Sequence, residues 1–146
     1  MMMKLTQILL LASLTITSSL VGAAPLISAK EAALPAASGA LATRGISRGP
    51  SVKLVSPEAD TPVNSPLDFK VNFEARGEGK IDPSSVKVVY MKSPFVDLTP
   101  RLKNSISATG IDFSKADVPS GSHTIRVTAK DTDGRETNTV FTLVVK

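Results

Sequence analysis

Three side chains in the C-terminal part of the chain are those most able to do chemistry. Asp131 and Asp133 lie two positions apart before Gly134, so their carboxylates can approach one hard cation such as Ca²⁺. His123 is the single histidine and can serve as a metal ligand or a base. Calcium takes six to eight oxygens, and this stretch lacks the third acidic position and the distal glutamate of an EF-hand. Asp131, Asp133 and His123 are therefore weak candidates for a metal site.

A structural role is the alternative interpretation of the acidic pair. The segment Asp131-Thr132-Asp133-Gly134 places glycine where a hairpin loop often needs a positive φ, and aspartates accept local backbone N–H bonds in such turns. The chain has no cysteine and no second histidine to complete a ligand set, and no nucleophile stands beside a base. We therefore expect a hairpin turn, a non-catalytic protein and no cofactor.

Contact residues for a partner are expected in the segment 93–107, which has no clear strand pattern. Phe95 is the one aromatic ring that falls outside an alternating pattern. Loops at the ends of β-sandwiches carry recognition more often than the sheets do. Phe95, Asp97 and Arg101 are the predicted contact residues, and the alternative for Phe95 is a cap over the end of the sandwich.

The distribution of charge argues against nucleic acid as the partner. The whole chain has a net charge of +4, but residues 51–146 hold 13 Lys and Arg against 12 Asp and Glu. A nucleic-acid footprint is a basic stripe interleaved with stacking aromatic side chains. The sequence shows neither, so we expect no nucleic-acid binding.

The N-terminal residues 1–23 have the pattern of a secretory signal peptide. Lys4 precedes an apolar core at residues 8–14, and a polar segment leads to Val21-Gly22-Ala23, which predicts cleavage after Ala23. An uncleaved membrane anchor is the alternative, but polar residues interrupt the run. No cysteine is present to carry a lipid. We therefore expect export to the periplasm or the exterior, with no membrane insertion after cleavage.

Residues 24–50 are rich in alanine, proline, glycine and serine, and have no sustained period of two or of 3.6. Such a segment is typical of a solvated linker, and a helical turn within residues 28–37 is marginal without packing partners. We expect a flexible linker over residues 24–50.

Residues 51–146 carry the signal of an all-β domain. Apolar and polar residues alternate in residues 67–76, 124–130 and 141–145, as in half-buried antiparallel strands. Shorter strands are predicted at 52–55, 86–91 and 111–113, with turns at Asp82-Pro83-Ser84-Ser85 and Asp131–Gly134. Without cysteines, the stability of this domain must come from its core.

Three stretches of residues 51–146 resemble the immunoglobulin-like domains, also described as fibronectin III-like, of bacterial exported and surface proteins. They are Leu54-Val55-Ser56-Pro57-Glu58, Ile81-Asp82-Pro83-Ser84-Ser85-Val86 and the segment from Pro119 to Arg135. The resemblance implies a single antiparallel sandwich of about seven strands. It also implies that His123 takes the place of a corner tyrosine that hydrogen-bonds back to the preceding turn. The inter-sheet cysteines and core tryptophan of antibody domains are missing.

The same domain is similar at both ends to small periplasmic copper-resistance β-sandwich proteins. The similarity lies in residues 54–60 and in the final hairpin, from Asp133-Gly134 to residues 141–145. Arg135 stands where those proteins place a histidine after Asp-Gly, and a methionine-rich loop is missing. A copper- or calcium-binding periplasmic protein is therefore the alternative function. The function we expect first is an exported interaction or structural module that binds a protein of the cell envelope, or a glycan.

Overall fold

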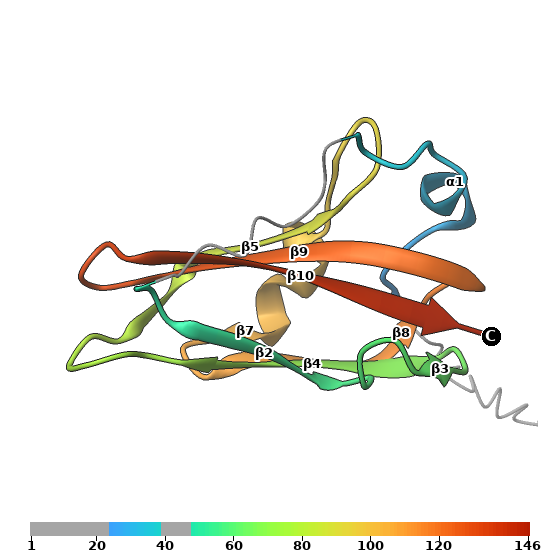
Figure 1. Ribbon diagram of the computed structural model, residues 1–146. Helices are drawn as coiled ribbons and strands as arrows, with labels where there is room; N and C mark the ends of the chain where they lie inside the picture. The colour runs from blue at the N-terminus through green and yellow to red at the C-terminus, as the bar shows by residue number, and fades with distance from the viewer. Residues whose placement is uncertain (1–23, 39–47) are drawn as a thin grey trace, which may run out of the picture.

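The computed structural model describes residues 24–38 and 48–146, which form an all-β sandwich of two mixed sheets (Figure 1). The fold class predicted from the alternating pattern is confirmed. The predicted signal peptide and residues 39–47 of the predicted linker lie outside the described residues.

The first sheet has the strand order β1-β8-β4-β2, and β7 pairs with β8 beside this path. Its long strands are β2 (Ser51–Ser56), β4 (Leu67–Glu74) and β8 (Gly110–Asp117). Its short strands are β1 (Ala24–Pro25) and β7 (Ile106–Ser107). Along β4, buried and exposed side chains alternate as predicted, so that one face of the sheet supplies the core.

The second sheet has the order β3-β10-β9-β5-β6. Its long strands are β5 (Ile81–Tyr90), β9 (Gly121–Asp131) and β10 (Glu136–Val145), and its short strands are β3 (Pro62–Val63) and β6 (Val96–Asp97). The sheets are not purely antiparallel as predicted, because β1 runs parallel to β8 and β3 runs parallel to β10.

The core lies between the two sheets and is apolar. Phe69 of β4, Tyr90 of β5 and Ile125 of β9 are fully buried in it. Leu98 and Leu102 add to it from the connection between β6 and β7, where helix α2 (Thr99–Leu102) and a 3₁₀ turn (Lys103–Ser105) lie. Within the described part of the chain there is no helix of the length and apolar character that crossing a bilayer requires.

The prediction of a flexible linker over residues 24–50 is wrong for residues 24–38. Strand β1 pairs with the edge of β8, and Leu26 and Ile27 directly after it are buried in the core cluster. Helix α1 (Ala29–Ala32) follows, and Ser28 and Glu31 close a capping box at its N-terminus. Tertiary contact supplies the stability that so short a segment lacks by itself.

The predicted turn at residues 82–85 is an irregular part of β5. The pairing of β5 with β9 shifts register between Asp82 and Lys87, and the Asp82 carboxylate accepts hydrogen bonds from the backbone N–H and the hydroxyl of Ser84. The local turn chemistry was therefore correctly predicted, but the strand continues past it as a bulge.

Candidate functional site

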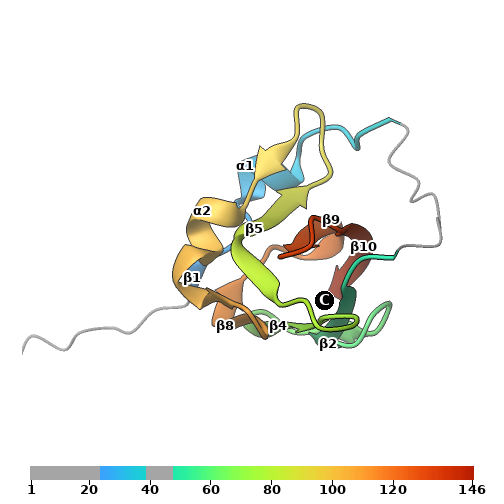
Figure 2. The same ribbon diagram turned by 90° about the vertical axis from the view of Figure 1, so that its left-hand side faces the viewer.

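The loop between β5 and β6 projects from the sandwich beside α1 (Figure 2), and Phe95 is its last residue, directly before β6. Its side chain is 57% exposed. Among the described residues, the only other large hydrophobic residue that is exposed is Val55. The guanidinium carbon of Arg126 lies 5.6 Å from the centre of the Phe95 ring. A cation over one face of the ring holds the ring in place while its other side stays in solvent.

The N-terminal segment supports this loop from the side. Ala36 forms an isolated β-bridge with Lys92, and the backbone N–H of Ser93 donates to the carbonyl of Pro35 at 2.9 Å. A depression of about 320 Å³ lies along this contact, lined by Ala37, Ser38, Lys92, Ser93, Pro94 and Phe95. Residues far apart in the sequence thus make up one surface, which we call the tip surface.

Asp97 does not face the tip surface with Phe95. Its carboxylate oxygen Oδ1 accepts a hydrogen bond of 3.0 Å from the backbone N–H of Thr99, at the start of α2. The carboxylate thus bonds within its own turn, although it also lines a depression of about 580 Å³ with residues of β5 and α2.

Arg101 also points elsewhere, because it ties down the N-terminal segment. Its Nη1 donates to the carbonyl of Leu26 and to Oε2 of Glu31, both at 2.8 Å, and its Nη2 makes a very short contact with Oε1 of Glu31. The guanidinium lowers the pKa of Glu31 to about 2, and the same hydrogen bonds raise the pKa of Arg101. Lys92 also binds the N-terminal segment, since its Nζ donates to the carbonyl of Ala32.

His123 is buried and has the structural role predicted for it. Its Nε2 lies 2.6 Å from the carbonyl oxygen of Pro119 in the preceding turn, and its Nδ1 lies 2.8 Å from the hydroxyl of Tyr90. Because a carbonyl can only accept, Nε2 carries the proton and Nδ1 accepts from Tyr90. Burial is the main cause that lowers the pKa of His123, and Lys92 lowers it further. Both ring nitrogens are thus occupied.

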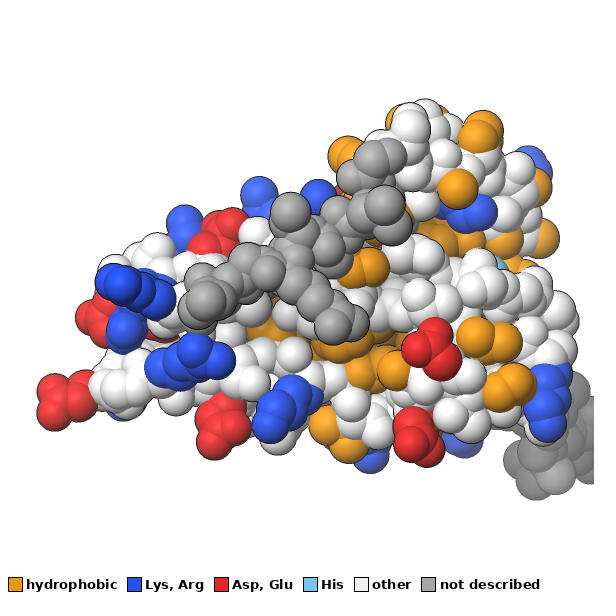
Figure 3. Space-filling view, viewed as in Figure 1, with side chains coloured by type: hydrophobic (Ala, Val, Ile, Leu, Met, Phe, Trp, Pro, Cys, Tyr) orange, Lys and Arg blue, Asp and Glu red, His pale blue; other side chains and the backbone are white. Residues whose placement is uncertain are grey.

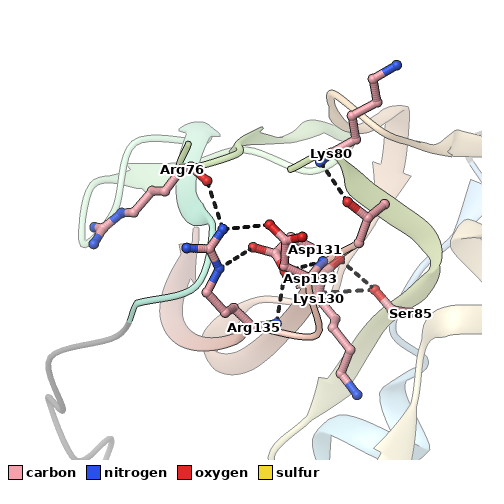
Figure 4. A network of polar contacts seen from close by, with 8 residues as sticks. Arg76, Lys80, Ser85, Lys130, Asp131, Asp133 and Arg135 are labelled. Atoms are coloured by element: carbon pink, nitrogen blue, oxygen red, sulfur yellow. Dashed lines mark hydrogen bonds and ion pairs between the residues drawn. The ribbon is translucent and has the colours of Figure 1, made fainter. Parts of the chain in front are cut away.

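Asp131 organises the β9–β10 hairpin (Figure 4). Its buried carboxylate accepts hydrogen bonds through Oδ1 from the backbone N–H groups of Asp133 and Arg135, and through Oδ2 from Arg135 Nε at 3.0 Å. Gly134 takes a φ of 82° in the turn, as predicted. Arg135 Nη2 reaches Asp133 and the carbonyl of Arg76. The acidic pair therefore neutralises an arginine.

The metal candidates do not come together. Asp131 and His123 stand at opposite ends of β9, roughly 26 Å apart in an extended strand. Within residues 24–38 and 48–146, no group of three His, Cys, Asp or Glu side chains could hold a metal ion.

A basic cluster on the outer face of the second sheet was not predicted. Lys87 of β5 and Arg126 and Lys130 of β9 line a depression of about 370 Å³, together with Ser85, Thr128, Glu136 and Asn138. In the sequence, each of these cations is only one polar position of an alternating strand. The pairing of β5 with β9, which brings them together, cannot be read from the sequence. We call Lys87, Arg126 and Lys130 the basic face.

Charged side chains of both signs cover the end of the sandwich that holds the β9–β10 hairpin (Figure 3).

No protein-family model matches this chain, and neither does any curated protein or solved structure. The argument for function therefore depends on the surface of the molecule itself.

Proposed function

We propose that this protein is a non-catalytic, exported binding module that holds a protein partner of the cell envelope through the tip surface. The observation that carries the proposal is Phe95, a large ring that is more than half exposed at the end of a loop. Burial of apolar surface contributes a free energy of about 25 cal/mol for each Å² removed from water, and the exposed part of this ring gains it only when a partner covers it.

The surroundings of Phe95 suit a contact residue. Arg126 lies against the ring, and aromatic and arginine side chains are enriched among the residues that dominate the energy of protein–protein interfaces. The bridge from Ala36 to Lys92 supports the loop, so little conformational entropy remains to be lost on binding. The depression beside Phe95 can receive a side chain of the partner.

The metal-binding alternative has less support from the geometry. Both nitrogens of His123 are bonded within the domain, and the Asp131 carboxylate accepts three hydrogen bonds from its own hairpin. A metal ion would have to break these bonds before it could be held. The signal-peptide pattern of residues 1–23 supports export, and with it a partner in the cell envelope.

Photocrosslinking from the tip surface tests the proposal. A photoreactive benzoylphenylalanine in place of Phe95 is expected to form a discrete protein adduct in intact cells of the source organism. Excess purified wild-type protein should compete for that adduct, whereas the Phe95→Ser variant should compete at least tenfold less well, the loss expected for a contact worth about 1.4 kcal/mol.

Val55 provides the matched control, because it is 58% exposed and lies on β2 of the other sheet. The same photoreactive residue at position 55 should not form the adduct. An adduct of equal yield from both positions would show that the reaction is unspecific, and no competition by the wild-type protein would contradict the tip surface as the contact.

A further inference from the structure

We propose that the basic face binds a carboxylated polysaccharide, separately from the protein partner of the tip surface. The site is formed by Lys87, Arg126 and Lys130, with the polar side chains of Thr128 and Asn138 between them. Arg126 belongs to both surroundings, because it also contacts the Phe95 ring. Neither Lys87 nor Lys130 lines the tip surface, so variants of these two lysines test the proposal independently of the proposed function.

The strand register places these side chains on one side of the sheet. Lys87 is opposite Thr128, and Thr128 is opposite Asn138, so the three form a row across β5, β9 and β10. Arg126 and Lys130 lie two positions to either side of Thr128 and therefore share its face. The result is a shallow, polar depression with cations around it.

The cations have bonding capacity to spare. Arg126 Nε is shielded from solvent and has no hydrogen-bond partner among the described residues, although its guanidinium contacts the Phe95 ring. A buried N–H without an acceptor costs free energy, so a movement of the side chain that brings an anionic oxygen to Nε would be favoured. The Lys87 ammonium makes no hydrogen bond or ion pair with any of the described residues, although its backbone pairs within the sheet.

The carboxylates nearby do not cancel this charge. Lys130 Nζ lies 3.8 Å from Glu136 with both side chains nearly half exposed, which is a weak pairing. Asp82, the acidic residue in register with Lys130, is bonded to Ser84 within its own bulge. Three cations against two carboxylates leave a net attraction for an anion.

The face suits a sugar chain better than a peptide. The backbone of β9 is paired on both sides, by β5 and β10, so an extended peptide has no free edge to join. A peptide lying across the side chains would leave its own N–H and C=O groups with few partners. The Thr128 hydroxyl donates to Asn138 Oδ1 and Asn138 Nδ2 donates to Glu136, so sugar hydroxyls can still donate to Thr128 Oγ1 and accept the second N–H of Asn138.

The spacing of the cations points to a polymer. Arg126 and Lys130 are four positions apart on one strand, which is roughly 13 Å. A ligand that carries carboxylates on successive sugars can therefore pair with both cations at once.

Isothermal titration of the purified protein with polygalacturonate oligomers tests this assignment, with neutral dextran and poly-L-glutamate as comparison ligands. We expect binding of polygalacturonate that weakens with added salt, weaker binding of poly-L-glutamate and none of dextran. Lys87→Gln and Lys130→Gln should each lower the affinity about fivefold, and together at least 20-fold. Lys53 and Lys115, exposed residues of the other sheet, give the control, because changing both to Gln removes the same charge and should alter the affinity less than twofold.

An equal loss in the control variant would show that only the overall charge matters and would overturn the site. Tighter binding of poly-L-glutamate would replace the polysaccharide with an acidic protein, and no binding of polygalacturonate at low ionic strength would refute the proposal. The double variant Lys87→Gln, Lys130→Gln should still form the photocrosslinked adduct from position 95. Loss of polysaccharide binding with the adduct retained therefore concerns the basic face alone, and loss of the adduct concerns the tip surface.

Discussion

The imidazole of His123 shows how a single side chain joins two parts of the fold. It connects the turn before β9 with Tyr90 of β5, and it does so only in its neutral form, because Nδ1 must accept the hydroxyl proton. If Nδ1 were protonated, it and the Tyr90 hydroxyl would both be donors, and a charge would stand in a buried site. Protonation of His123 is therefore linked to the stability of the domain.

We expect the free energy of unfolding to fall as the pH is lowered from about 7 to 5. Unfolded histidine titrates near pH 6.5, and burial lowers the pKa of His123 in the folded protein. The unfolded state therefore takes up the proton first, and stability is lost as the pH drops through that window. Urea denaturation at several pH values measures the slope. His123 is the only histidine, so a His123→Gln variant that kept the full slope would contradict this assignment.

Asp131 and Asp133 should differ in their effect on stability, because one carboxylate is buried and the other is exposed. Asp131→Ala removes the acceptor for two backbone N–H groups and for Arg135, so we expect a loss of about 2–3 kcal/mol. Asp133→Ala breaks an exposed pair and should cost less than about 1 kcal/mol. Thermal denaturation gives both values.

Calcium provides a second test of the same hairpin. Since these carboxylates pair with an arginine, addition of calcium should leave the melting temperature of the wild-type protein and of the Asp131→Asn, Asp133→Asn variant unchanged. A rise in the melting temperature of the wild-type protein alone would restore the calcium hypothesis.

Single positions were only partly predictable at the candidate site. Phe95 was singled out as the one ring outside an alternating pattern, and it is exposed. Arg101 was predicted as a contact residue for a partner and instead bonds to Glu31 and Leu26 far along the chain. The pairing of Lys87 with the strand of Arg126 depends on register, which a single sequence does not reveal.

At the scale of elements, segment 24–38 behaves as part of the domain. Leu26 is fully buried, so we expect Leu26→Ala to lower the free energy of unfolding by about 2–4 kcal/mol. The exposed Val55 provides the comparison, since Val55→Ala should change it by less than about 0.5 kcal/mol. Urea denaturation measures both. A change below 1 kcal/mol for Leu26→Ala would indicate that the segment is detached in solution.

The long strands were predictable where burial follows a period of two. Strand β4 matches the alternating stretch 67–76 closely, whereas the stretches 124–130 and 141–145 cover only part of the longer strands β9 and β10. The start of β5 was missed because Pro83 and its neighbours have turn chemistry inside a bulged strand. Strand β1 was missed because two apolar residues are too few for a period, and their place is set by the distant β8.

At the scale of the whole molecule, the sandwich depends on its core. The chain contains no cysteine, and its buried apolar residues come from both sheets and from the N-terminal segment. We expect the exported protein to begin at Ala24, because residues 21–23 have the small-residue pattern of a cleavage site. Intact-mass spectrometry of protein recovered from the periplasm of a bacterial host checks the position. A mass that retains residues 1–23 would instead favour the membrane anchor.

The pairing of β1 with β8 would set an order of folding events if the protein is exported as we propose. Ala24 pairs with Ala116, so β1 cannot form its sheet contacts before β8 is available. If the chain crosses the membrane from its N-terminus, Leu26 and Ile27 stay uncovered for most of the passage, and the sandwich can close only when translocation is nearly complete. Contacts between residues far apart in the sequence form more slowly than local ones, so the chain would stay unfolded while it crosses the membrane. On the proposed route of export, the dependence of β1 on β8 would keep the sandwich from closing before most of the chain has crossed the membrane.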